Sequence, residues 1–233
     1  MELTIVGSII FIILGILATD FIAATQHWIE DNYLSYDSKW FQDTARANTL
    51  HHYHPRAITC KTNTEIYNAK LPRIVICILL FWYAFVYRYY RICFFLIGFI
   101  LTSALPEINH KYTHMRDCER PYFVSLLQNS GLLVSRKQHV VHHSSEYSEG
   151  NYGMLLGFTN FFYDRVFHIW TLLEMTIPPC CKKTNKFPEQ PICKDACPRP
   201  VTKEEYNRSA RKLYKLYVTK GTSFCKKQDD DYD

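Results

Sequence analysis

The hydrophobic and polar positions of this chain are strongly segregated along the sequence. Three apolar runs stand out, at residues 3–25, 71–87 and 92–105. The first run would be ~34 Å long as a helix, which is enough to cross a bilayer. A cleavable signal peptide is the competing interpretation, but no Lys or Arg precedes the run and it is long for such a signal. We therefore expect about three transmembrane helices.

Two further segments are partly apolar. Residues 122–134 are apolar but short, and residues 154–170 are rich in aromatic side chains but include Asp164, Arg165 and His168. Both are better explained as interfacial or re-entrant helices than as spans. The pattern predicts an all-α integral membrane protein in which about three transmembrane helices are combined with such helices.

Composition narrows the class of function. The 233 residues are 48% hydrophobic, and the net charge is +5. Lys and Arg in cytosolic loops explain a mild positive charge in a membrane protein. There is no basic patch with interleaved aromatic residues, so we expect no nucleic-acid partner.

The chain divides into two parts by composition. Residues 1–175 are expected to form the membrane domain, and residues 176–233 a Cys- and Lys-rich, flexible cytosolic tail with one short helix near 203–217. Five of the nine cysteines lie in this tail, in a spacing that matches no standard zinc finger. Reduced thiols, or lipidated ones near the membrane, are favoured over a zinc ion there.

The distribution of Lys and Arg predicts an orientation. If the N-terminus is luminal, residues 26–71 and the chain after Pro106 face the cytosol, and the turn at 88–91 is luminal. This agrees with the positive-inside rule apart from two arginines in the turn. All ten histidines then lie on one side, provided that 122–134 does not cross. Asp20 is costly in lipid and should therefore face protein or lie at the boundary.

The histidines are the candidate metal ligands. They include His27, a group at 51–54, an HxxxH at 110–114 and an HxxHH at 139–143. Residues three and four apart share one face of a helix, so each group could present imidazoles to one cavity. Imidazole suits iron, zinc and copper. Three such groups at membrane exits are hard to explain as packing alone.

Three polar residues near these groups have other candidate roles. Asp31 lies four residues after His27 and is placed to orient a ligand ring from the second shell. His54 precedes a proline, where either a second-shell role or a plain loop role is open. His168 lies in the aromatic segment and is favoured as an interfacial residue rather than a ligand.

A metal site at a membrane exit suits oxidation of a lipid. Removing hydrogens from unactivated methylene groups needs an oxidant made from O₂, which iron supplies and side chains cannot. A lipid chain enters from the bilayer, so the site belongs where helices leave it, and apolar surroundings would limit side reactions.

The ordered motifs resemble those of the Kua-type lipid desaturase family, which includes plasmanylethanolamine desaturase. The resemblance covers roughly residues 15–170. The segments that carry it are Asp20-Phe21, His27-Trp28, Asp31, residues 51–59, residues 109–114, residues 136–143 and residues 149–152.

The resemblance implies a site and an activity. It implies an O₂-dependent desaturase with two iron ions, in the endoplasmic reticulum with the site facing the cytosol, and electrons from cytochrome b5. The best-known reaction of the family forms the vinyl ether of a plasmalogen from the 1-O-alkyl chain of an ether phospholipid. By the resemblance the iron ligands are His27, His51, His52, His110, His114, His139, His142 and His143.

The resemblance leaves other functions open. Gln138 stands where the animal enzymes have an additional histidine, and His54 where they have Asp. An acyl-chain desaturase or hydroxylase of another phospholipid on the same diiron site is therefore one alternative. A non-enzymatic metal-binding membrane protein is the other.

Overall fold

The computed structural model describes residues 4–34, 41–53, 55–143 and 150–177, and these are helical, with one isolated β-bridge between Leu133 and Leu156. The predicted tail helix, most of the predicted tail and His54 lie outside the described residues. The elements are α1 (Ile5–Asn32), α2 (Gln42–Tyr53), η1 (Pro55–Cys60), α3 (Asn63–Val86), α4 (Tyr90–Thr102), α5 (Leu105–Thr113), η2 (Asp117–Glu119), α6 (Tyr122–Asn129), α7 (Arg136–His143), α8 (Thr159–Phe161), η3 (Phe162–Val166) and α9 (Ile169–Glu174).

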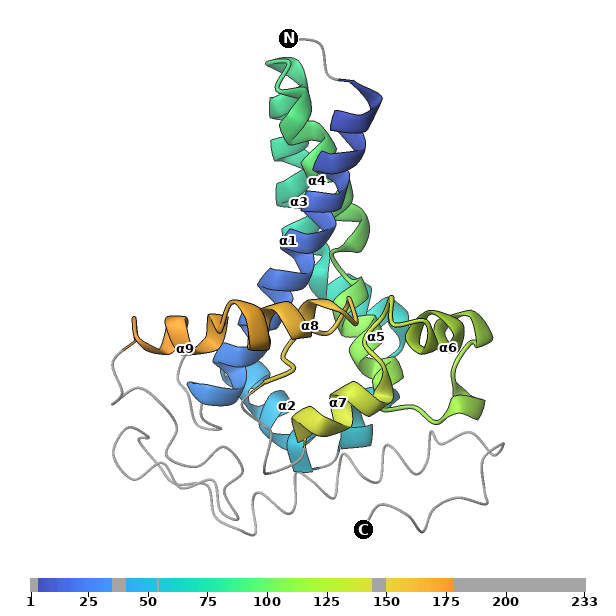
Figure 1. Ribbon diagram of the computed structural model, residues 1–233. Coiled ribbons are helices and arrows are strands. Elements are labelled where there is room, and N and C mark those ends of the chain that lie inside the picture. Colours follow the sequence, from blue (N-terminus) through green and yellow to red (C-terminus); the bar gives the residue numbers. More distant parts are fainter. Residues whose placement is uncertain (1–3, 35–40, 54, 144–149, 178–233) are drawn as a thin grey trace.

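Two long helices, α1 and α3, and the 13-residue α4 form an upright bundle at one end of the molecule. Figure 1 shows α1, α3 and α4 standing together, with α9, α8, α5 and α6 spread sideways at their base and α2 and α7 beyond. Three stretches are long and apolar enough to cross a membrane: Ile5–Asn32, Asn63–Val86 and Tyr90–Thr113. This confirms the prediction of an all-helical protein with three candidate spans.

Helices α1 and α4 approach each other at two glycines. A Cβ added at Gly15 would lie 2.0 Å from the backbone oxygen of Phe95, and one at Gly98 would lie 2.1 Å from that of Ile12. Only glycine allows this backbone-to-backbone contact, which is a common way for helices to pack in a membrane. The contact holds α1 and α4 in one fixed register.

The helix boundaries differ from the apolar runs in two places. Helix α1 continues past residue 25 to Asn32, so His27 lies on the same helix as the lipid-facing residues. Helix α4 ends at Thr102, before the end of the apolar run at residue 105, and Pro106 lies in the first turn of α5. Proline suits that position because the first-turn N–H groups have no intrahelical partner.

The two short apolar segments are not spans. Helix α6 has 8 residues, ~12 Å of helix, which is far too short to cross a bilayer. Residues 154–170 form α8, the single π-helical turn η3 and then α9, with a break at His168, whose φ is 47°. Exposed apolar side chains on α6 and around η3 suit an interfacial position, as expected.

Asp20 joins the bundle to the segment around α8. It is fully buried in α1. Its carboxylate accepts hydrogen bonds from the backbone N–H of Leu155 (3.0 Å) and from the hydroxyls of Thr159 (2.6 Å) and Tyr163 (3.2 Å). The acid faces protein, and its bonds offset the cost of burying it.

Candidate metal centre

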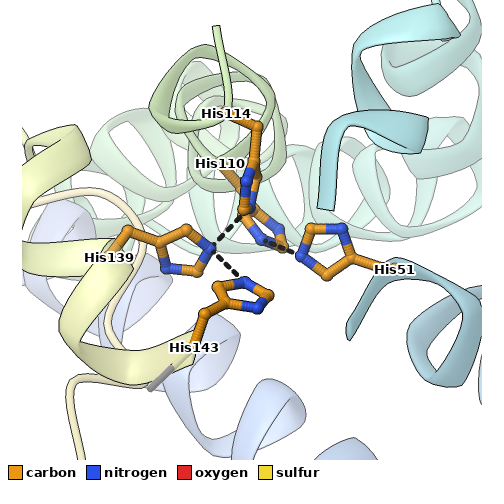
Figure 2. Close-up of side chains that lie close together, drawn as sticks. All are labelled: His51, His110, His114, His139 and His143. Carbon is orange, nitrogen blue, oxygen red and sulfur yellow. Dashed lines mark hydrogen bonds between the residues drawn. The ribbon is translucent and has the colours of Figure 1, made fainter. Parts of the chain in front are cut away.

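Five histidines from three helical segments point into one space at the base of the bundle. One ring nitrogen from each lies within 4.8 Å of the others. Figure 2 shows them converging from α2, from α5 and its C-terminal end, and from α7: His51, His110, His114, His139 and His143. Because α5 supplies an i,i+4 pair and α7 another, each helix directs two rings to the same side.

The Nε2 atoms of this five-histidine group face one another. His139 Nε2 lies 2.7 Å from His114 Nε2 and 3.0 Å from His143 Nε2. His110 Nε2 lies 3.0 Å from His51 Nε2. A neutral imidazole has one N–H and one lone pair, so these contacts can be only partly satisfied by hydrogen bonds.

Burial keeps these rings neutral. Desolvation lowers the pKa of His51, His114 and His139 well below the usual histidine value, and the neighbouring histidines lower it further. Uncharged imidazole is the form that binds a metal ion. The five-histidine group is therefore a cluster of nitrogen donors in a buried space.

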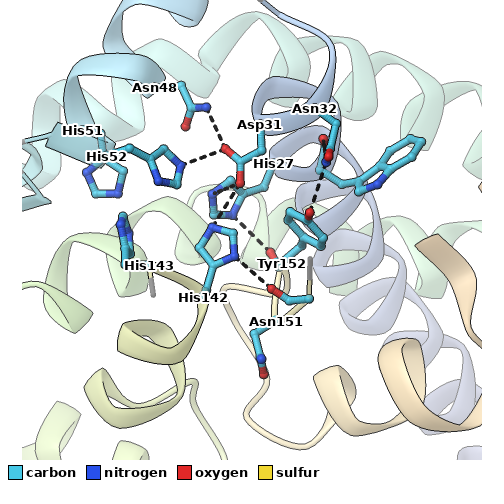
Figure 3. Close-up of polar contacts among 12 residues, drawn as sticks. His27, Asp31, Asn32, Asn48, His51, His52, His142, His143, Asn151 and Tyr152 are labelled. Atoms are coloured by element: carbon cyan, nitrogen blue, oxygen red, sulfur yellow. Dashed lines mark hydrogen bonds and ion pairs between the residues drawn. The ribbon is translucent and has the colours of Figure 1, made fainter. Parts of the chain in front are cut away.

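A second group lies beside the first, around Asp31. Its members are His27, Asp31, His52 and His142, whose ligand atoms also lie within 4.8 Å of one another. Figure 3 shows the Asp31 carboxylate between the rings of His52 and His142. His52 Nε2 lies 2.9 Å from Asp31 Oδ1, and His142 Nε2 and His27 Nε2 lie 3.1 and 3.7 Å from Oδ2. We call these four residues the Asp31 group.

Backbone carbonyls orient two rings of the Asp31 group. His27 Nδ1 lies 3.3 Å from the carbonyl oxygen of Tyr152, and His142 Nδ1 lies 2.9 Å from that of Gly150. A carbonyl only accepts, so each Nδ1 donates and each Nε2 points toward Asp31. Histidine ligands commonly donate their second N–H in this way.

Three side-chain amides, those of Asn48, Asn109 and Gln128, form hydrogen bonds next to the histidines. Asn48 donates to Asp31 Oδ1 at 2.8 Å. Asn109, next to His110, donates to the carbonyls of Val134 and Met154 and accepts from Gln128. The sequence does not predict these contacts, although Asn109 lies in the segment 109–114 that carries the family resemblance.

Gln138 has a structural role at the start of α7. Its Oε1 accepts from the backbone N–H of Ser135 at 2.9 Å, while the Ser135 hydroxyl accepts from the N–H of Gln138 at 3.3 Å. This reciprocal pair is a capping box. Gln138 Nε2 also donates to the carbonyl of Gly157. Gln138 thus fastens α7 and is in neither candidate metal group.

All eight histidines proposed as ligands fall in the two groups. Asp31, which we expected to orient a ligand ring, has its own ligand atom among those of His27, His52 and His142. His168 is exposed and belongs to neither group. His54 lies outside the described residues, so its role stays open. The identity of the eight histidines as ligands stays a prediction.

Comparisons of the sequence with known proteins found a family and two relatives. The lipid desaturase domain family matches residues 16–186. A probable fatty acid desaturase of Acanthamoeba polyphaga mimivirus is 32% identical over 177 residues, which are 75% of this chain and 84% of that protein. The chloroplastic fatty acid desaturase 4 of Arabidopsis thaliana is 29% identical over 150 residues, 63% of this chain but 44% of that protein. A search of solved structures found no match.

Proposed function

Because the chain belongs to the lipid desaturase family, we propose that it is an O₂-dependent diiron enzyme that desaturates a chain of a membrane phospholipid. The observation that carries the proposal is the convergence of eight histidines into two adjacent groups at the base of three candidate spans. A desaturase of this kind is an oxidoreductase that acts at a membrane.

The residues of the two groups fit a pair of iron ions. In the Asp31 group, the buried ligand atoms without a hydrogen-bond partner include His27 Nε2, Asp31 Oδ2 and His142 Nε2, and in the five-histidine group the Nε2 atoms converge. Bound iron would supply the O₂ chemistry that takes two hydrogens from neighbouring carbons of the lipid chain, which side chains cannot do. The carbonyls of Tyr152 and Gly150 would fix the ring tautomers, and burial of the histidines would limit access of water.

The reaction also requires two electrons from a donor. Loss of two hydrogens from the lipid and reduction of O₂ to two waters balance only if two electrons and two protons are added. We propose cytochrome b5 as the donor and the endoplasmic reticulum as the location, with the site facing the cytosol. The Lys- and Arg-bearing segments on the predicted cytosolic side support this orientation.

The first candidate substrate is an ether phospholipid. In this reaction the 1-O-alkyl chain of plasmanylethanolamine becomes the vinyl ether of a plasmalogen. The ordered set of histidine motifs from His27 to His143, which resembles that of plasmanylethanolamine desaturase, supports this substrate.

The second candidate is an acyl chain of another phospholipid. The printed names of both relatives, a probable fatty acid desaturase and fatty acid desaturase 4, favour it. The same pair of iron ions would serve either reaction, and the shape of the lipid path would decide between them.

Lipid mass spectrometry tests the proposal. The protein is expressed in cells that lack plasmalogens, and phospholipids two hydrogens lighter are sought. New acid-labile species would establish a vinyl ether, and new acid-stable species would establish an acyl desaturase. If iron-loaded protein produces neither in cells supplied with alkyl and acyl phospholipids, the proposed function is wrong.

A further inference from the structure

The contacts of Asp31 are not explained by hydrogen bonds alone. Its Oδ1 accepts a hydrogen bond from Asn48 and lies 2.9 Å from His52 Nε2, a contact whose nature depends on the tautomer of that ring. Its Oδ2 is buried without a hydrogen-bond partner, and so are the Nε2 atoms of His27 and His142 that lie nearest to it. These three buried polar atoms therefore face one another, and although His142 Nε2 lies 3.1 Å from Asp31 Oδ2, no hydrogen bond of good geometry joins them.

Two backbone contacts show which nitrogen of each ring faces Asp31. His27 and His142 each direct Nδ1 at a backbone carbonyl, which must be met by an N–H. Nε2 is therefore the atom that each ring presents to Asp31 Oδ2, and imidazole nitrogen and carboxylate oxygen are both ligand atoms for iron. These atoms converge with His52 in one buried group whose ligand atoms lie within 4.8 Å of one another.

The distances suit one metal ion. Nitrogen and oxygen ligands of a first-row ion such as zinc lie ~2.0–2.2 Å from it, so two ligands of one ion are at most ~4.4 Å apart. His52 Nε2 lies 2.9 Å from Asp31 Oδ1, and His142 Nε2 and His27 Nε2 lie 3.1 and 3.7 Å from Oδ2. All three distances are within that limit. A carboxylate that only oriented a ligand ring would instead meet the ring's N–H, on the side away from the metal.

We propose that Asp31 is itself a metal ligand and completes one site with His27, His52 and His142. This inference rests on the proposed diiron function. The two ions are then unequal, because five neutral imidazoles hold one and three imidazoles with one carboxylate hold the other. The carboxylate stabilises the more highly charged state of its own ion in particular.

The test is the iron content and the ⁵⁷Fe Mössbauer spectrum of purified, detergent-solubilised protein. Asp31→Asn keeps the size of the side chain and an oxygen acceptor but removes the charge. Asp31→Glu keeps the carboxylate. Glu30→Gln is the matched control, because it removes a carboxylate from the adjacent residue of α1, which is in neither group.

We expect the iron content of the Asp31→Asn variant to fall from two ions per chain to about one. Its Mössbauer spectrum should lose one component and keep the other. Asp31→Glu should recover the second ion with an altered signal, and Glu30→Gln should match the parent protein. Circular dichroism checks the helical content of each variant. If the Asp31→Asn variant does not fold, the Asp31→Glu variant tests the proposal. Its longer side chain shifts the ligand oxygen, so only the spectral component of that one iron ion should change.

Two results would overturn the proposal. Asp31→Asn that keeps both ions with an unchanged spectrum would make Asp31 a positioning residue. Loss of both ions from a folded Asp31→Asn variant would contradict two separate ligand sets. Failure of the proposed function would give a different result: the parent protein itself would hold no iron after reconstitution.

Discussion

The Nε2 atoms of His114 and His139 lie 2.7 Å apart, although 25 residues separate the two in the sequence. His114 ends α5 and His139 lies in α7. The segment between them, which includes α6, must leave and return on one side of the membrane. This relationship links the chemistry of the site to the topology of the chain.

Removing either ring should abolish turnover. We expect His114→Ala or His139→Ala to lower the rate of desaturation by more than about 100-fold, because a lost ligand costs more than a lost supporting residue. Iron content should fall while protein level stays near normal. His168→Ala, at an exposed position outside both groups, is the control. Retained turnover in either ligand variant would refute the assignment.

The topology can be tested at the turn after α6. A glycosylation acceptor inserted near residue 130 should stay unmodified in microsomes, because eight residues of α6 cannot cross the bilayer. An acceptor on a long spacer in the turn at Arg88, between α3 and α4, should be glycosylated. Efficient modification near residue 130 would contradict the proposed orientation.

The contact between α1 and α4 should not tolerate a larger residue. Gly15→Val places side-chain atoms against the backbone of Phe95, where even a Cβ would lie only 2.0 Å from oxygen. Overpacking of this kind costs about 1–3 kcal/mol or more. We expect a lower thermal midpoint in detergent, with Leu14→Ala on the exposed side of α1 as control. An unchanged midpoint would show that the helices can separate at little cost.

Loss of the Asp20 carboxylate should loosen the segment around α8. Asp20→Ala leaves the N–H groups of Leu155 and Leu156 and the hydroxyl of Thr159 without this acceptor. Each buried donor left unsatisfied costs ~1–3 kcal/mol. Limited proteolysis should then cleave between residues 154 and 163 faster than in the parent protein. Equal cleavage rates would show that other contacts hold the segment.

The cap at the start of α7 should support metal retention. Gln138→Ala removes the capping bond to Ser135 and the bond to Gly157, which should cost ~1 kcal/mol of stability. Since α7 carries three of the histidines, we also expect iron to be lost faster to a chelator. Lys137→Ala, exposed on the same turn, should behave as the parent protein does. If Gln138→Ala holds iron equally well, the helix is fixed by other contacts.

Much of the fold could be predicted because lipid leaves few choices. Long apolar runs give helices, and i,i+4 histidines share a face. The ends of the helices were less predictable. Helix α1 continues through polar residues to Asn32 because His27 and Asp31 are buried against other parts of the chain, which local hydropathy does not report.

The position of Asp31 shows where sequence reasoning stops. Spacing placed it one helical turn from His27 and therefore near the site. Only the approach of His52 from α2 and His142 from α7 brings its two oxygens among ring nitrogens. Likewise, the carbonyls of Gly150 and Tyr152 carry no side-chain signal, so their contacts with histidine could not be predicted.

The continuity of α1 fixes the distance between its N-terminal end and the histidine site. One unbroken helix runs from Ile5 to Asn32 and carries both the lipid-facing residues and His27. From Ile5 to His27 the axis measures ~33 Å, close to the ~30 Å thickness of the hydrocarbon core. If α1 spans the bilayer, the candidate metal centre would be held at a constant height, near the boundary where head groups begin. A chain that reaches it from the bilayer would be oxidised close to its head group rather than near its methyl end.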